Sequence, residues 1–345
     1  MHTTTPKSNK KWLNFPMWRR ALSVIPRLTA AEWAELDLIS RWLIASRAAV
    51  LVITFIPAVI AGVLAWRNNQ FNLTLWLLLT IGLVMAHATN NIVNDITDSW
   101  KGTDKGNYFR AQYGVQPIEH GLLTFRQAII YALVTGLIAL AAGLILVYWR
   151  GGLTLPLLGA GIFFVLFYTW PLKYIGLGEI AVIIVWGPLM IAGGYYVITG
   201  IWDWQIVLVS LPYALGATSV IFGKHIDKYQ ADKAKNIRTL PVILGERNAR
   251  YLAIGIMLAQ YLLVGYLILI RFFTPLLLLV LVAVRWLRLA WGVYRQPRPA
   301  APPPEYPADA WPLWFVSFSF VHNRAFGTWF LVGLILDAVV QRLIL

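Results

Sequence analysis

The 345-residue sequence contains no cysteine, which excludes disulfide bonds, thiolate metal sites and cysteine nucleophiles. Charged residues are scarce as well: they make up 13% of the chain, and only 15 residues are Asp or Glu. A typical soluble domain has about 25% charged residues, so this composition excludes an ordinary soluble domain. The first residues are basic and interrupted by proline, with no apolar stretch and cleavage site, and we expect no removable signal peptide.

Apolar sequence is what the chain has in abundance, because 59% of its residues are hydrophobic and the mean hydropathy is +0.65. A membrane span needs roughly 20 mostly apolar residues. This rule predicts an all-α integral membrane protein with about nine spans, at residues 43–65, 72–94, 127–149, 153–170, 177–198, 205–223, 250–270, 273–294 and 325–343. The short, proline-flanked segment Trp311–Val321 predicts an interfacial helix.

The basic residues are distributed unevenly between the two sides that nine alternating spans define. Of the 29 Lys and Arg residues, 25 fall on the side of the N-terminus, and only Arg67, Arg150, Arg271 and Arg342 fall on the other. Basic residues mark cytoplasmic loops. We therefore expect a multi-pass protein of the cell (inner) membrane, with a cytoplasmic N-terminus and the C-terminus on the opposite side.

This topology also divides the chain and assigns its partners. Residues 1–42 form a cytoplasmic N-terminal segment, and residues 43–345 form one multi-span domain in which 295–312 is a Pro-rich cytoplasmic linker. The net charge of +14 follows from the flanks of the spans, so we expect membrane lipid and no nucleic acid as a partner. The sequence indicates no obligate protein partner.

Several of the few acidic residues gather at the end of the second predicted span, in the stretch NDITDSWKGTD. Asn94 and Asp98 are four residues apart and share a helix face, Asp95 lies beside them, and Asp104 follows in a loop. Mg²⁺ prefers oxygen ligands and usually binds through one or two carboxylates together with substrate phosphate. The alternative is a solvated helix end, but carboxylates near a helix C-terminus oppose its dipole. The stretch therefore favours a metal site.

A second acidic cluster follows the sixth predicted span. Asp227 and Asp232 alternate there with basic residues, namely Lys224, Lys228, Lys233, Lys235 and Arg238. Such a mixture suits a metal ion and a bound anion together. It also suits an ordinary cytoplasmic loop with helical ion pairs such as Lys228 with Asp232, and both interpretations stay open.

Polar residues inside the other predicted spans are less informative. His87 in the second span is interpreted as a core histidine that hydrogen-bonds inside the protein. The segment from His322 to Arg324 precedes the last predicted span, where a position at the cytoplasmic opening and a simple helix entry are equally good interpretations.

The acidic clusters and their flanks resemble the UbiA family of intramembrane prenyltransferases over most of the chain. Asn94 to Asp104 fits the NDxxDxxxD-type motif in a longer form that ends GxD, and IRTLPVILG at 237–245 follows the second acidic motif as in that family. YTWPLKYIGLGE at 168–179 resembles the fourth connection, and Arg47 the first-helix arginine. GGYYVITG at 193–200 is similar to the branch that prenylates 1,4-dihydroxy-2-naphthoate for menaquinone.

Three departures from the family pattern affect its transfer to this chain. The separation of Tyr168 and Lys173 is one residue longer than the YxxxK of some members. Asp227 and Asp232 are five residues apart where the family usually has four, which separates them by about 140° on a regular helix. Where many members have RPLxxG, this chain has QPIEHG at 116–121 and lacks the arginine.

The resemblance implies a helical bundle around a central cavity with a cytoplasmic cap, and transfer of an isoprenyl group from a polyprenyl diphosphate to an aromatic acceptor. It implies Mg²⁺ held by Asn94, Asp95, Asp98, Asp104, Asp227 and Asp232. It implies catalytic roles for Asp98, Asp232 and Tyr168, the last through its π face. It implies substrate contacts from Arg47, Lys101, Arg110, Lys173, Lys228 and Arg238.

The sequence leaves two alternative functions open. The acceptor of the same reaction could be 4-hydroxybenzoate, a chlorin, a haem or a sugar phosphate, because acceptor choice depends on a pocket built from several spans. A transporter of an anionic metabolite would also need buried charge. Transport favours charges near the bilayer midplane, whereas the acidic residues here lie at span ends.

Overall fold

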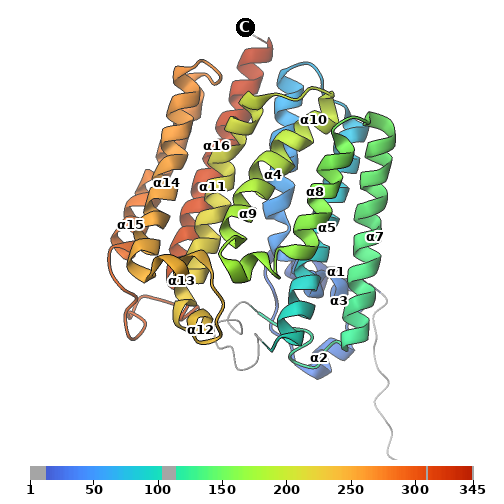
Figure 1. The fold of residues 1–345 in the computed structure, drawn as a ribbon, viewed down its shortest axis with the longest axis vertical. Coiled ribbons are helices and arrows are strands. Elements are labelled where there is room, and N and C mark those ends of the chain that lie inside the picture. The colour runs from blue at the N-terminus through green and yellow to red at the C-terminus, as the bar shows by residue number, and fades with distance from the viewer. Residues whose placement is uncertain (1–12, 103–113, 308–309, 344–345) are drawn as a thin grey trace, which may run out of the picture.

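The computed structural model describes residues 13–102, 114–307 and 310–343, and in these ranges every regular element is a helix. Figure 1 shows the long helices standing side by side as a bundle. The long helices are α4 (Val52–Arg67), α5 (Leu73–Trp100), α7 (Phe125–Arg150), α8 (Thr154–Phe167), α11 (Trp204–Asp227), α14 (Glu246–Leu269), α15 (Val284–Tyr294) and α16 (Phe315–Leu343). The short ones are α1 (Phe15–Ser23), α2 (Ala30–Ala34), α3 (Leu38–Ala45), η1 (Ala48–Val50), η2 (Leu172–Ile175), α9 (Gly178–Ile184), η3 (Val185–Ala192), α10 (Gly193–Thr199), α12 (Tyr229–Ala234), α13 (Leu240–Leu244) and η4 (Pro275–Ala283).

Eight helical segments in the described part of the chain are long and apolar enough to cross a membrane. They are Ala48–Arg67, Leu73–Trp100, Phe125–Arg150, Gly178–Thr199, Trp204–Asp227, Glu246–Leu269, Pro275–Tyr294 and Phe315–Leu343. The span expected at 153–170 is instead α8, whose 14 residues extend about 21 Å, less than the roughly 30 Å of a hydrocarbon core. The all-helical membrane fold is confirmed, and the number of nine spans is not.

The last helix begins earlier than the sequence suggested, so the interfacial helix expected at Trp311–Val321 is wrong. α16 starts at Phe315 and runs for 29 residues to Leu343. His322 does not interrupt it, because this residue is fully buried and its Nε2 lies 3.0 Å from the Tyr261 hydroxyl on α14. A polar side chain with a partner on a neighbouring helix is compatible with a continuous membrane helix.

Two packed regions bring the acidic segments to one end of the bundle. The main core lies where α4, η3, α11 and α16 meet, around Ile60, Ile191, Ile206 and Phe330. The N-terminal helices α1 to α3 share a buried apolar cluster with α5, which includes Trp33 and Ala88. In Figure 1 these helices, α12 and the C-terminal ends of α5 and α11 lie at one end, and the C-terminus of the chain lies at the other. We refer to the first as the acidic end.

At this end α11 and the start of α16 approach each other at Gly223. A Cβ atom there would lie 2.9 Å from both N and Cα of Val316 and 2.6 Å from the Tyr294 hydroxyl. We expect Gly223→Ala to destabilise the protein by about 1–3 kcal/mol, because backbone atoms cannot move aside as a side-chain tip does. Thermal unfolding in detergent measures this.

Gly255→Ala in α14 is the matched control, since no atom lies within 4 Å of a Cβ at that position. Alanine is favoured over glycine in a helix by about 0.5–1 kcal/mol, so this variant should melt at or slightly above the temperature of the unmodified protein. Equal melting temperatures for the two variants would show that the close approach of α11 and α16 is wrong.

Candidate active site

The first acidic stretch is part of a helix rather than a loop, because α5 continues through Asp98 to Trp100. Asn94 donates a hydrogen bond from Nδ2 to Thr169 Oγ1 at 3.0 Å. Asp98 accepts hydrogen bonds from Lys173 Nζ at 3.0 Å and 3.2 Å. Asn94 and Asp98, which share a face as expected, therefore both contact the connection between α8 and α9.

Asp95 has a different partner from its two neighbours. Its side chain forms an ion pair with Arg47, whose left-handed backbone (φ 56°) immediately precedes η1. Asp95 is only 6% exposed. The structure thus pairs two residues predicted for different roles, the metal ligand Asp95 and the substrate-binding Arg47, with each other. Asp104 and Arg110, also predicted site residues, lie outside the described residues.

Lys173 is the basic residue at the centre of this end of the bundle. It lies on η2 and is 9% exposed. Burial lowers the pKa of the Lys173 ammonium, but the Asp98 carboxylate and the neighbouring Tyr174 and Asp232 together raise the pKa above its ordinary value. The charge of Asp232 acts on Lys173 in the same direction. The protonated Lys173 side chain therefore interacts electrostatically with carboxylates from both acidic clusters.

The second cluster contributes Asp232 from α12. Asp232 is 3% exposed, and its Oδ1 lies 3.3 Å from Lys228 Nζ one helical turn earlier. The charges of Lys173, Lys228 and Lys224 all act on Asp98. Asp98 and Asp232, which are 134 residues apart in sequence, thus belong to one site. We call it the lysine–carboxylate site, and it consists of Asn94, Asp98, Lys173, Lys228 and Asp232.

Asp227 contacts a different part of the fold. Its Oδ1 and Oδ2 accept backbone hydrogen bonds from Phe315 and Val316, each at 3.0 Å, at the start of α16. Arg298 in the Pro-rich linker donates to the Asp227 carbonyl at 3.2 Å and to that of Pro312 at 3.2 Å. Asp227 therefore caps the start of α16. Its five-residue separation from Asp232 is compatible with this role, because side chains at that spacing point in different directions on a regular helix.

A tight turn at Gly176 helps to hold residues 168–179, which include Lys173, against the second acidic cluster. Gly176 has φ +82°, a backbone conformation that favours glycine, and a Cβ there would lie 2.3 Å from Ile243 Cδ1. Arg238 donates its backbone N–H to the Tyr174 carbonyl at 3.2 Å. The tight turn thus brings the 168–179 connection and the loop before α13 together.

Three further predicted residues, Lys101, Arg238 and Tyr168, are located by their contacts and charged neighbours. The Lys101 ammonium lies 4.8 Å from the centre of the Trp170 ring and 5.7 Å from that of Tyr174. The Arg238 side chain is exposed. The charges of Asp98 and Glu179 both act on the hydroxyl of Tyr168. The predicted Tyr168 therefore lies beside the acidic residues.

Sequence reasoning missed two residues of this region. Glu179 is 1% exposed, its Oε1 lies 2.6 Å from His225 Nδ1, and its Oε2 accepts the Leu240 N–H at 3.4 Å. Thr169, which binds Asn94, was also not named. Glu179 could have been found, because an ionisable residue at the start of an apolar span is costly unless it has a partner.

Among the described residues, no three acidic or histidine side chains converge to form a metal site. The oxygen donors of the site are nevertheless of the type Mg²⁺ binds, and two of them already lie beside ammonium groups at 3.0 Å and 3.3 Å. Mg²⁺ commonly takes one or two carboxylates and completes its shell with water and substrate phosphate. The residues therefore fit Mg²⁺ bound together with a phosphorylated ligand rather than in an all-protein cage.

The model of the UbiA prenyltransferase family matches residues 54–334. The chain belongs to the UbiA prenyltransferase family. Among curated relatives, this UbiA member is 29% identical over 220 residues to 1,4-dihydroxy-2-naphthoate octaprenyltransferase of Escherichia coli (strain K12), an alignment that covers 61% of this chain and 70% of the relative.

Solved structures show the same UbiA fold. The apo structure of a UbiA homologue from Aeropyrum pernix K1 matches with a TM-score of 0.61 and 19% identity, over 83% of this chain and 97% of the homologue. A homologue from Archaeoglobus fulgidus bound to GPP and Mg²⁺ matches with a TM-score of 0.56 and 13% identity, over 85% and 99% of the two chains. The expected fold class and family are thereby confirmed, and the chain belongs to a family of prenyltransferases.

Proposed function

We propose that this UbiA protein transfers an isoprenyl group from a polyprenyl diphosphate to an aromatic acceptor with the help of Mg²⁺, and that the acceptor is 1,4-dihydroxy-2-naphthoate, in menaquinone biosynthesis. The observation that carries the proposal is the lysine–carboxylate site, in which the buried carboxylates of Asp98 and Asp232 both interact electrostatically with Lys173. This site lies at the end of an apolar bundle. The E. coli relative and the GGYYVITG stretch support the naphthoate.

Asn94, Asp98 and Asp232 would hold the Mg²⁺. Asn94 donates a hydrogen bond from Nδ2 to Thr169, so its amide oxygen could serve as a metal ligand. The carboxylates of Asp98 and Asp232 are both buried. The proposed set excludes Asp227 and Asp95, whose side chains are engaged with α16 and Arg47. Mg²⁺, when bound, supplies positive charge to the diphosphate oxygens and so stabilises the leaving group.

The side chains of this chain account for the remaining requirements of the reaction. Lys173 and Lys228, which lie beside the two carboxylates, would bind diphosphate oxygens that are not bound to the metal ion. The allylic C–O bond breaks with its electrons leaving on diphosphate, and a C–C bond forms to the electron-rich ring. The attacked ring carbon then regains aromaticity by losing its proton or, if it is the carbon that bears the carboxylate, by losing CO₂. Tyr168 would stabilise the allylic cation through its π face, and the apolar bundle excludes water that would quench the cation.

The distribution of basic residues supports a cytoplasmic location for this chemistry. The acidic end carries α1 to α3, α12 and the basic loops, whereas the C-terminus lies at the opposite end (Figure 1). With the N-terminus cytoplasmic, the diphosphate head would enter from the compartment in which soluble prenyl diphosphates and acceptors are found.

The test is Mg²⁺-dependent release of diphosphate from geranylgeranyl diphosphate by the purified protein, with and without 1,4-dihydroxy-2-naphthoate. We expect release that requires both Mg²⁺ and the acceptor, together with a prenylated naphthoquinone product identified by its mass, which also shows whether CO₂ was lost. EDTA should abolish release because the diphosphate charge is then left without metal.

Other outcomes would change the proposal in defined ways. Diphosphate release with 4-hydroxybenzoate, a chlorin, a haem or a sugar phosphate, but not with the naphthoate, would keep the reaction class and replace the acceptor. No release with any acceptor and several prenyl lengths would overturn the proposed reaction.

A further inference from the structure

An apolar cavity lies at the end of the bundle opposite the lysine–carboxylate site. It has a volume of about 230 Å³ and is formed by α4, the start of α5 and α16. Val59, Val63 and Trp66 line it from α4, and Ile335 and Ala338 line it from α16. Ile335 is 43% exposed, so the cavity borders the lipid-facing surface of the bundle.

A cation lies at the outer end of this cavity. Ile335, Ala338 and Arg342 are spaced on one face of α16, and Arg342 is one turn, about 6 Å, beyond Ala338. The Arg342 guanidinium carbon lies 4.3 Å from the centre of the Trp66 ring. Its Nη1 donates to the Trp66 carbonyl at 2.8 Å. Trp66 therefore joins the apolar wall and the charge.

Arg342 and its buried neighbour Arg67 differ in whether a carboxylate pairs with their charge. Arg67 Nη1 lies 3.6 Å from the carboxylate of the fully buried Asp337. Arg342, in contrast, has no carboxylate within ion-pair distance among the described residues. Its guanidinium has five N–H donors, and only the bond to Trp66 uses one of them within the described part of the chain. An anion is thus the complementary partner.

We propose that this cavity binds an anionic phospholipid of the leaflet opposite the acidic end, with an acyl chain against Val59, Val63 and Ile335 and the phosphate on Arg342. An apolar groove that runs along two membrane helices and ends at a cation matches the order of groups in a phospholipid. Arginine is suited to bidentate phosphate binding, and tryptophan at this depth packs beside lipid headgroups.

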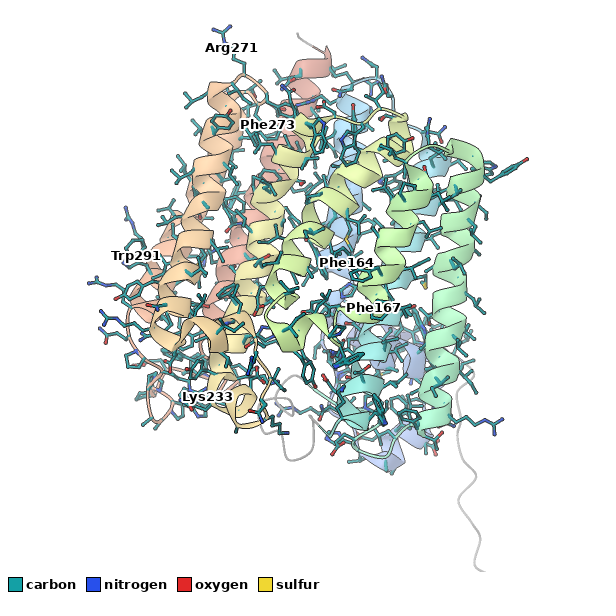
Figure 2. All side chains as sticks on the ribbon, viewed as in Figure 1. Phe164, Phe167, Lys233, Arg271, Phe273 and Trp291 are labelled. Carbon is teal, nitrogen blue, oxygen red and sulfur yellow. The ribbon has the colours of Figure 1, made fainter. Side chains whose placement is uncertain are left out.

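The test is native mass spectrometry of the full-length protein purified with equal amounts of phosphatidylglycerol and phosphatidylcholine. The unmodified protein should retain phosphatidylglycerol in preference. Arg342→Gln should lower retained phosphatidylglycerol roughly fivefold, the contribution of one basic residue near a membrane surface, and leave phosphatidylcholine unchanged. Arg271→Gln is the matched control, because Arg271 is exposed and extends from the same end of the molecule (Figure 2).

A second variant separates lipid binding from folding. Ile335→Trp enlarges an exposed wall residue, fills the cavity and leaves Arg342 in place, so it should also lower retention of phosphatidylglycerol in protein that elutes as a single species. Equal retention of both lipids by the unmodified protein, or unchanged phosphatidylglycerol in Arg342→Gln or Ile335→Trp, would overturn the proposal.

Discussion

An Asp98→Ala variant is expected to lose prenyl transfer, with turnover at least about 100-fold below that of the unmodified enzyme. Asp98 is 5% exposed, and the charges of three lysines act on it. Its removal takes away a proposed Mg²⁺ ligand, and loss of one preorganised charged group at a leaving group costs about two to three orders of magnitude in rate. Diphosphate release under saturating Mg²⁺ measures the effect.

Folding must be separated from chemistry in this experiment, because Asp98→Ala leaves Lys173 without its carboxylate partner. Removing one member of a buried ion pair costs about 3–5 kcal/mol. The double variant Asp98→Ala with Lys173→Met removes both charges and should recover thermal stability but not activity. Asp203→Asn is the control, since Asp203 caps the start of α11 at the opposite end. Near-normal Mg²⁺-dependent turnover in folded Asp98→Ala would disprove the site.

Much of the fold could be predicted because a bilayer imposes a simple rule on sequence. A backbone in lipid must satisfy its hydrogen bonds within the helix, so long apolar segments become spans. The rule failed at the start of the last span, which it placed at residue 325, because His322 lies inside α16 and has Tyr261 on α14 as its partner. His87 was interpreted correctly, since its Nδ1 lies 2.7 Å from Thr54 Oγ1. Neither partner is visible in a single segment of sequence.

The candidate site was also predictable only in part, because local sequence shows the acidic residues but not their partners elsewhere in the chain. The acidic clusters at span ends gave Asp98 and Asp232 as candidates, because carboxylates next to apolar segments are costly without a function, and the structure buries both near Lys173. The pairing of Asp98 with Lys173, which lies 75 residues later, depends on how the bundle closes. The roles of Asp95 and Asp227 depend on Arg47 and on the start of α16, and no local pattern contains those partners.

The second acidic cluster gives a prediction that separates two aspartates five residues apart. Asp232→Asn should lower turnover at least about 100-fold. It should also lower thermal stability, because it leaves the buried Lys228 without its carboxylate partner. Asp227→Ala should destabilise the protein, since it removes the acceptor of the Phe315 and Val316 N–H groups. Each buried N–H left without a partner costs about 1–3 kcal/mol.

Measurements on folded protein distinguish the two residues. At a temperature well below unfolding, Asp227→Ala should retain the Mg²⁺ concentration dependence of the unmodified enzyme, whereas Asp232→Asn should need more Mg²⁺ and reach lower turnover. Asp227→Asn keeps one acceptor oxygen and should melt between Asp227→Ala and the unmodified protein. If Asp227→Ala and Asp232→Asn weakened Mg²⁺ dependence equally, the end of α11 would have to unwind during catalysis, so that both carboxylates reach the metal and the cap on α16 is released in each turnover.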